Sequence, residues 1–194
     1  DLLGFYPITT VTTTGDQALN NTVPFPAGRH TNGQGLRAYV VCSSGAATTA
    51  MGAGTPNIQI TYTDQAGNTG NTTPTVLPAG TTAAPKGSIV YSGTGAGKYG
   101  PFLPLAAGDS GIRSVEQFNL SASYVSGVLN LVICRPLLTL PMTTIGVAAE
   151  RDLLNQVPSL PRIYDGANLA WLMYAGAATP VNSAFYGHLD FGWS

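Results

Sequence analysis

The chain has very little charge. Only 9% of its 194 residues are Asp, Glu, Lys or Arg, against roughly 25% in ordinary soluble domains. The formal net charge is −1, and Lys and Arg form no cluster. Binding to nucleic acid requires a basic surface that neutralises phosphates, so no nucleic-acid partner is predicted. So few charges also leave little to keep a free monomer soluble, which indicates that partner chains cover much of the surface.

Long apolar runs and cysteines are scarce as well. No run approaches the length of a membrane-spanning helix, so no membrane partner is predicted. The two cysteines, Cys42 and Cys134, fall in predicted strands. They form either a bridge between adjacent strands or two buried thiols, and we favour the thiols. His30 and His188 have no cysteine or acidic partner at ligand spacing, so neither a metal nor a cofactor is predicted.

Glycine, proline and apolar residues are abundant. The chain has 24 Gly and 14 Pro, yet 44% of its residues are hydrophobic and 9 are Tyr. Disordered chains are poor in hydrophobic and aromatic residues, so disorder does not explain this composition. Many short strands joined by frequent turns do. The composition therefore predicts an all-β protein.

The most regular stretch is 111–136, in which two apolar-rich runs are joined by Ser126-Gly127. Such a dipeptide is typical of a two-residue β-hairpin turn. With Val125 opposite Val128, directly opposed residues point to the same face. The residues collected on the face predicted to be buried are Leu120, Ala122, Tyr124, Leu129, Leu131 and Ile133. We therefore predict that this stretch is the central hairpin of the fold.

Alternating apolar and polar residues predict strands elsewhere along the chain. These strands are expected at 35–44, 57–63, 88–91, 168–174 and 183–193. The stretch 147–156 fits either a short helix or strand and loop. Seven to nine strands with almost no helix indicate an antiparallel β-sandwich or jelly roll over residues 35–194.

Residues 1–34 are predicted to form an extended N-terminal arm with at most one strand. Several prolines and glycines prevent a long regular element, while Leu3, Phe5 and Ile8 can anchor the arm. Two interpretations remain open. The arm lies across a neighbouring subunit, with these three residues as candidate inter-subunit contacts, or it packs on its own domain.

The tempting catalytic string is Gly108-Asp109-Ser110-Gly111, which matches the nucleophile segment of chymotrypsin-like serine proteases. The Gly-Pro that follows that segment in these enzymes is absent here. Such an enzyme also needs a histidine base and an orienting acid, and neither His30 nor His188 has the required sequence setting. We therefore predict a turn in which Asp109 caps backbone amides, and no catalytic residue. A hydrolase with Ser110 as its nucleophile is a competing hypothesis.

Two other polar strings are interpreted as loops. The segment 93–99 lacks the first glycine and the final hydroxyl residue of a phosphate-binding loop. The segment 64–68 offers oxygen ligands, but one carboxylate, that of Asp64, is too few for a typical calcium site. A hairpin turn explains 64–68 better.

Several segments resemble structural proteins of tailed bacteriophage virions. They read ITYTD at 60–64, AGDSGIRSV at 107–115, VICRPL at 132–137 and DGANL at 165–169. The resemblance implies a β-sandwich that assembles symmetrically on the head, neck or tail of the particle. It implies no catalytic residue.

We therefore predict a non-enzymatic structural protein of a phage virion, a capsid-associated decoration or cement subunit. It is expected to form homo-oligomers, either trimers or hexamers, and to contact other virion proteins such as the major capsid protein. Its location would be the virion, assembled in the bacterial host cytoplasm. The alternative is a secreted or tail-associated carbohydrate-binding module, for which Tyr39, Trp171, Tyr186 and Trp193 are the candidate aromatic platforms.

Overall fold

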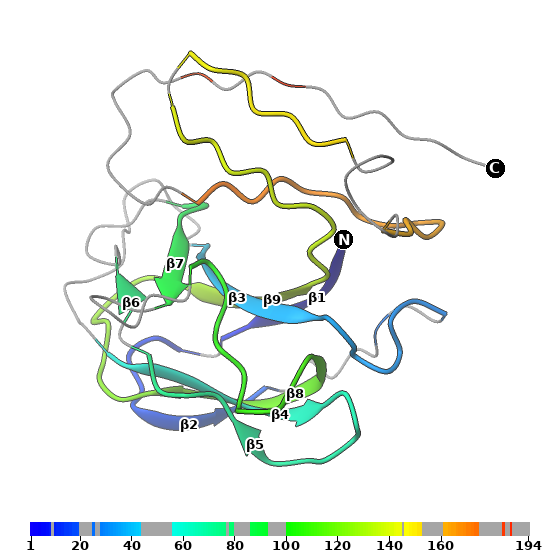
Figure 1. Ribbon diagram of the computed structural model, residues 1–194. Coiled ribbons are helices and arrows are strands. Elements are labelled where there is room, and N and C mark those ends of the chain that lie inside the picture. The colour runs from blue at the N-terminus through cyan, green and yellow to red at the C-terminus, as the bar shows by residue number, and fades with distance from the viewer. Residues whose placement is uncertain are drawn as a thin grey trace.

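The computed structural model describes residues 1–8, 10–19, 25, 28–43, 56–76, 78–79, 86–92, 100–144, 146–152, 161–174, 184 and 187. This part of the chain contains nine strands and no helix (Figure 1). The strands are β1 (Leu2–Pro7), β2 (Gly15–Ala18), β3 (Arg37–Cys42), β4 (Ile58–Asp64), β5 (Asn71–Thr72), β6 (Pro78–Ala79), β7 (Ile89–Ser92), β8 (Ile112–Leu120) and β9 (Leu129–Cys134).

The strands form two antiparallel sheets that pack face to face. The five-stranded sheet has the order β1-β9-β3-β7-β6, and the four-stranded sheet has the order β2-β8-β4-β5. Figure 1 shows the first sheet above the second. Most consecutive strands lie in different sheets, so the chain crosses repeatedly between the layers; β4 with β5 and β6 with β7 are the sequential pairs. The fold is an all-β sandwich, as the composition predicts.

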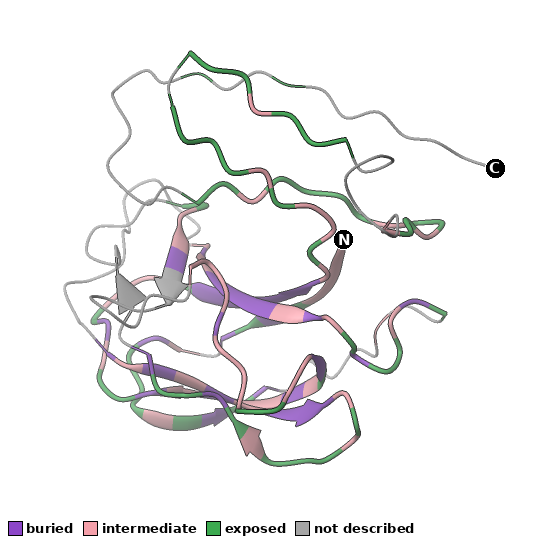
Figure 2. Ribbon diagram, viewed as in Figure 1, coloured by how far each residue is buried: buried purple, intermediate pink, exposed green. Residues whose placement is uncertain are grey.

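One continuous core fills the space between the sheets (Figure 2). It is built by the inward face of each strand, where every second side chain is apolar. The largest side chains that are fully buried there are Tyr62, Tyr124, Phe118, Leu36, Ile58, Ile60, Ile112, Leu120, Leu129, Leu131 and Ile133. Truncating a core position of this kind to alanine typically costs about 2–5 kcal/mol.

The predicted alternation of the strands over 35–44 and 57–63 is confirmed. In β3 and the residue before it, Leu36, Ala38, Val40 and Cys42 are all fully buried. In β4, Ile58, Ile60 and Tyr62 face the same core. The strand predicted at 88–91 is also present, as β7.

The predicted central hairpin is wrong. β8 pairs with β2 and β4, whereas β9 pairs with β1 and β3, so the two runs lie in opposite sheets. The residues between β8 and β9 do not form a tight hairpin. Tyr124 in this connection is fully buried, and its amide donates to Val11 O at 2.9 Å. Leu120, Leu129, Leu131 and Ile133 are buried as expected, but they meet across the core, and Ala122 is exposed.

The expectation of at most one strand in residues 1–34 is also wrong. β1 pairs with β9 at one edge of the five-stranded sheet, and β2 pairs with β8 at one edge of the other. Tyr6, Ile8 and Val11 are buried in the core. Over its described residues, the stretch interpreted as an arm therefore belongs to both sheets.

The extended segment lies at the other end of the chain. The strand predicted at 168–174 is absent: Asn168 forms an isolated bridge to Leu2, and the residues after it form no strand. Residues 147–152 are neither helix nor strand, while 153–156 and most of the strand predicted at 183–193 lie outside the described residues. Figure 1 shows the described residues from 136 onward above the five-stranded sheet, on the side away from the core.

Candidate functional site

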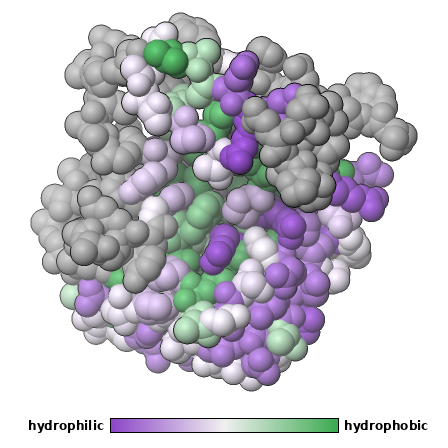
Figure 3. All heavy atoms as spheres, viewed as in Figure 1, coloured by the Kyte–Doolittle hydropathy of each residue, from purple (hydrophilic) through white to green (hydrophobic). Residues whose placement is uncertain are grey.

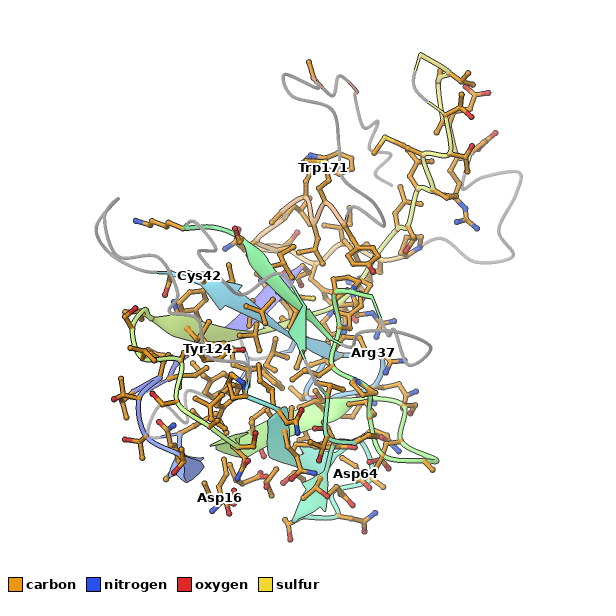
Figure 4. The ribbon with its side chains drawn as sticks, turned by 90° about the vertical axis from the view of Figure 1, so that its left-hand side faces the viewer. Asp16, Arg37, Cys42, Asp64, Tyr124 and Trp171 are labelled. Atoms are coloured by element: carbon orange, nitrogen blue, oxygen red, sulfur yellow. The ribbon has the colours of Figure 1, made fainter. Side chains whose placement is uncertain are left out.

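We call the described residues from 136 onward the C-terminal segment. It carries most of the large apolar side chains that are exposed in the described part of the chain. Its Trp171 is 76% exposed, and Figure 4 shows this residue on the segment above the sandwich, whereas Tyr124 lies between the sheets. The exposed apolar residues of the segment are Met142, Val147, Ile163, Leu169, Trp171, Met173 and Tyr174. Large apolar side chains left exposed along one segment are candidates for contacts with another molecule.

The strands at the sheet edges offer little for pairing with another chain. β1 ends with Pro7 and β6 begins with Pro78, and proline has no amide hydrogen to donate. β5 and β6 have only two residues each, and β2 has four. An interaction with another chain is therefore favoured on the C-terminal segment over the edges.

A small polar cluster, which we call the latch, ties the C-terminal segment to β1. Arg29 forms an ion pair with Asp1 at 2.9 Å, and its other terminal nitrogen donates to Gly166 O. Leu2 N donates to Asn168 O at 2.8 Å, and Asn168 N donates to Asp1 Oδ1 at 3.1 Å. The side chains of Arg29 and Asp1 are 8% and 3% exposed, so the pair is screened from solvent and depends on both partners.

His30 extends the latch. Its ring packs edge-on against the ring of Tyr164, with the centroids 5.1 Å apart. Arg162 stacks over the Tyr164 ring, with its Cζ atom 4.8 Å from the centroid. Burial, followed by the positive charges of Arg135 and Arg29, lowers the pKa of His30. The residue has a φ of +50°, a left-handed conformation in which histidine is more common than most residues. His30 is therefore placed to hold residues 162–164 against the sandwich as a neutral ring.

Beyond the latch, the C-terminal segment covers part of the outer face of the five-stranded sheet. Tyr39, Val132 and Cys134 form a second apolar cluster on that face, and Phe102 and Leu172 pack on it. The rings of Tyr39 and Phe102 meet edge to face at 6.3 Å. Burial raises the pKa of Tyr39, and it raises the pKa of the Cys134 thiol to about 11. Figure 3 shows hydrophobic residues gathered in the middle of the view and hydrophilic residues along its lower rim.

The three predicted contact residues occupy different environments. Ile8 is buried in the core of its own chain, and Leu3 packs against that core. Phe5 is 52% exposed. That these residues contact a neighbouring chain stays a prediction, and Phe5 is the member of the set whose exposure suits it.

Among the described residues, Ser110 has no histidine as a hydrogen-bond partner. Its hydroxyl donates to Gln34 Oε1 at 3.1 Å, and its amide and that of Gly111 donate to Gln65 Oε1 at 3.0 and 3.1 Å. The turn predicted here is present, but Asp109 does not cap these amides. Its carboxylate accepts a hydrogen bond from Tyr62, and burial, followed by this hydrogen bond, raises the pKa of that phenol. The described residues around Ser110 hold a turn and place no base at its hydroxyl.

The hairpin turn predicted at 64–68 is confirmed. β4 pairs with β5 across it. Asp64 Oδ1 accepts the amides of Ala66 and Asn68 at 2.8 and 2.9 Å, while its other oxygen accepts the Asn68 side chain at 2.7 Å. The Asn68 side chain and these amides lower the pKa of Asp64. Its oxygens are therefore used in the turn.

Cys42 and Cys134 are both buried and form no disulfide, which confirms the favoured interpretation of two buried thiols. They lie on different faces, Cys42 in the main core and Cys134 in the outer cluster. In the described part of the chain, no three His, Cys, Asp or Glu side chains gather as a metal site would require. None of the described segments forms a helix of the length and hydrophobicity that a bilayer span requires.

The two candidate carbohydrate platforms among the described residues differ in exposure. Tyr39 is buried on the outer sheet face and Trp171 is exposed. Tyr186 and Trp193 lie outside the described residues.

Sequence reasoning missed both the latch and the exposed C-terminal segment. A signal for the segment is present in the proline positions, Pro136, Pro141, Pro158 and Pro161, because prolines at this density exclude a regular strand. No comparable signal marks the latch. Comparison of the chain with protein-family models, with curated proteins and with solved structures finds no match in any of the three.

Proposed function

We propose that this chain is a non-enzymatic structural protein of a tailed-phage virion, a capsid-associated decoration or cement subunit that forms symmetric homo-oligomers. The observation that carries the proposal is the C-terminal segment. Its described residues present seven exposed large apolar side chains, on a chain with only 9% charged residues. Surfaces of this kind are covered in the functional state.

The architecture supports an assembly role in a second way. The sandwich is held by an unbroken apolar core, and the polar groups around Ser110 and Asp64 are engaged in turns. The virion assignment rests on the resemblance of segments 60–64, 107–115, 132–137 and 165–169 to virion proteins. Its expected partners are copies of itself and other virion proteins such as the major capsid protein.

The test is the mass of the full chain in solution, measured by analytical ultracentrifugation over a range of concentrations. We expect a closed oligomer, either a trimer or a hexamer. Replacing Leu169, Trp171 and Met173 by serine should shift the distribution toward monomer. The matched control replaces Val125 and Val128, which are also exposed but lie on the β8–β9 connection, and it should leave the mass unchanged. A monomer at the highest concentration would rule out the homo-oligomer.

The virion location has its own test. Antibodies raised against the chain, detected with gold particles in electron micrographs of the source phage, should decorate the particle at symmetric positions. Labelling of unassembled protein alone, with bare particles, would remove the virion assignment.

A carbohydrate-binding module is the alternative, favoured by the exposed indole of Trp171. Exposed aromatic rings stack on sugar faces in such modules. A glycan array distinguishes the two functions, because binding that is abolished by Trp171→Ala in a monomeric chain would replace the structural role with recognition of sugar.

A further inference from the structure

We propose that residues 161–174 form a strap that is exchanged between copies of this chain. In the assembly, the strap of one copy docks on the latch and the outer sheet face of a neighbour. This inference rests on the proposed function as a homo-oligomeric subunit, and it names the segment and the docking site that build the oligomer.

The docking site for the strap is present on every copy. It consists of Asp1, Leu2 at the start of β1, Arg29, and the apolar cluster around Tyr39. The strap supplies main-chain groups at Gly166 and Asn168 and the side chain of Leu172. Because an identical site exists on each copy, exchange creates the same contacts between chains without a new surface, as in domain swapping.

The chain between β9 and the strap is long enough for exchange. Residues 135 and 161 are 26 positions apart, and an extended chain spans up to roughly 90 Å over that number of residues. A domain of the size of this sandwich has a radius of gyration of about 14 Å. Residues 141–144 and 146–148 are exposed, and Arg151 donates to Thr139 O within the same stretch at 2.9 Å. The connection thus has the reach to place the strap on a neighbour.

After docking, some apolar side chains of the strap stay exposed, and a second copy would cover them. When the strap occupies the site, Leu172 faces the sheet, but Leu169, Trp171 and Met173 on either side of it are exposed. Exchange brings the body of the donor copy next to the body of the recipient at this point. The three side chains would then lie at the junction of two sandwiches. The edge strands β1 and β6 carry proline, and β6 is very short, so contact between copies through the strap is favoured over pairing of strand edges.

The test uses the antiparallel bridge between Leu2 and Asn168. Opposed residues in such a bridge have Cα atoms about 5.5 Å apart, within the span of a disulfide. Two differently tagged full chains are co-expressed, one with Leu2→Cys and the other with Asn168→Cys. Both also carry Cys42→Ala and Cys134→Ala, because Leu2 lies opposite Cys134 in the ladder. Neither chain can form this disulfide within itself, so a disulfide-linked pair after diamide oxidation reports exchange.

Two further combinations of variants complete the experiment. One chain carrying both Leu2→Cys and Asn168→Cys should give linked chains on a non-reducing gel. The matched negative control pairs Leu2→Cys with Ser121→Cys, an exposed position after β8 in the other sheet, and should give no linked pair. Pull-down through both tags shows that mixed oligomers are present.

The outcomes separate this inference from the proposed function. Linked pairs in tag-verified mixed oligomers support exchange. An oligomer in which the doubly substituted chain closes its disulfide only within itself overturns exchange and leaves the homo-oligomer standing. Mixed oligomers without any disulfide in either arrangement also overturn it, since the bridge is then not made. A monomer at all concentrations overturns the proposed homo-oligomer together with the exchange.

Discussion

The backbones of Gly33 and Gly111 touch where the loop before β3 meets the start of β8. A Cβ atom added to Gly111 would lie 1.9 Å from Gly33 O. Around this contact Ile112 N donates to Gly33 O at 3.1 Å, and Gly35 N donates to Ser110 O at 3.0 Å. The last glycine of the protease-like string is therefore required for the close approach of a loop leading to one sheet and a strand of the other.

Replacing Gly111 with alanine should destabilise the sandwich. The added carbon meets rigid backbone, so the two segments must separate, and overpacking of this kind costs about 1–3 kcal/mol or more. Urea denaturation followed by tryptophan fluorescence measures the loss. Gly187→Ala is the matched control, because a Cβ added there meets no atom within 4 Å. Equal stability of the two variants would contradict the close approach.

In place of Val125, glycine should give a more stable protein than alanine, the reverse of the usual order. Its φ of +68° is unfavourable for any residue with a Cβ and most so for a β-branched one. The side chain is 70% exposed, so little packing is lost on truncation. We expect Val125→Gly to be about 1 kcal/mol more stable than Val125→Ala. Thermal unfolding of the two variants side by side decides the sign, and a more stable alanine variant would refute the strained conformation.

The strand patterns were predictable because they depend on local alternation. Ile58, Ile60 and Tyr62 mark one face of β4 directly in the sequence, and the structure buries all three. The same alternation misled at β8 and β9. Leu120 and Ile133 point into one core whether they are neighbours in a hairpin or face each other from two sheets. Alternation reports which side is buried but not which strand is the partner.

The latch was not predictable because its residues are distant in the sequence. Arg29 and Gly166 are separated by 137 positions, and the contact uses a main-chain carbonyl that any residue provides. That Tyr6, Ile8 and Val11 belong to the sandwich core was missed for a related reason. Pro7 and the other prolines and glycines of residues 1–34 suggested an arm, yet an edge strand tolerates proline at its end.

Ser110 should be unreactive in the folded protein. Its hydroxyl donates to the amide oxygen of Gln34, which is no base at neutral pH. A fluorophosphonate probe should therefore leave the full chain unlabelled, while a serine hydrolase in the same tube is labelled to completion. Stoichiometric labelling that disappears in Ser110→Ala would establish the hydrolase hypothesis instead.

His30 should make stability depend on pH in the range just below neutrality. Its pKa in the folded chain is lowered, first by burial and then by the charges of Arg135 and Arg29, whereas the unfolded chain has the ordinary value of about 6.5. Asp1 Oδ2 lies 3.8 Å from His30 Nε2 and favours the charged ring, but Arg29 already neutralises that carboxylate. The folded state therefore holds the ring neutral where the unfolded state binds a proton.

The direction in which stability changes with pH follows from which state of the chain binds the proton. Above about pH 7 both states are neutral at His30, so this residue adds no pH dependence there; as the pH falls through about 6.5 toward the lower folded pKa, the unfolded state takes up a proton and stability falls, by at most about 1.4 kcal/mol per pH unit. His30→Asn removes the titration while keeping a residue that tolerates φ of +50°, so between pH 5.5 and 7 its stability should change less with pH than that of the unmodified protein. His188→Asn, which changes the other histidine of the chain, should keep the slope of the unmodified protein. Urea unfolding at four pH values across this range measures all three slopes. If His30→Asn and the unmodified chain lose stability in parallel, the ring is not held neutral by the latch, and its contact with Tyr164 has to be explained by packing alone.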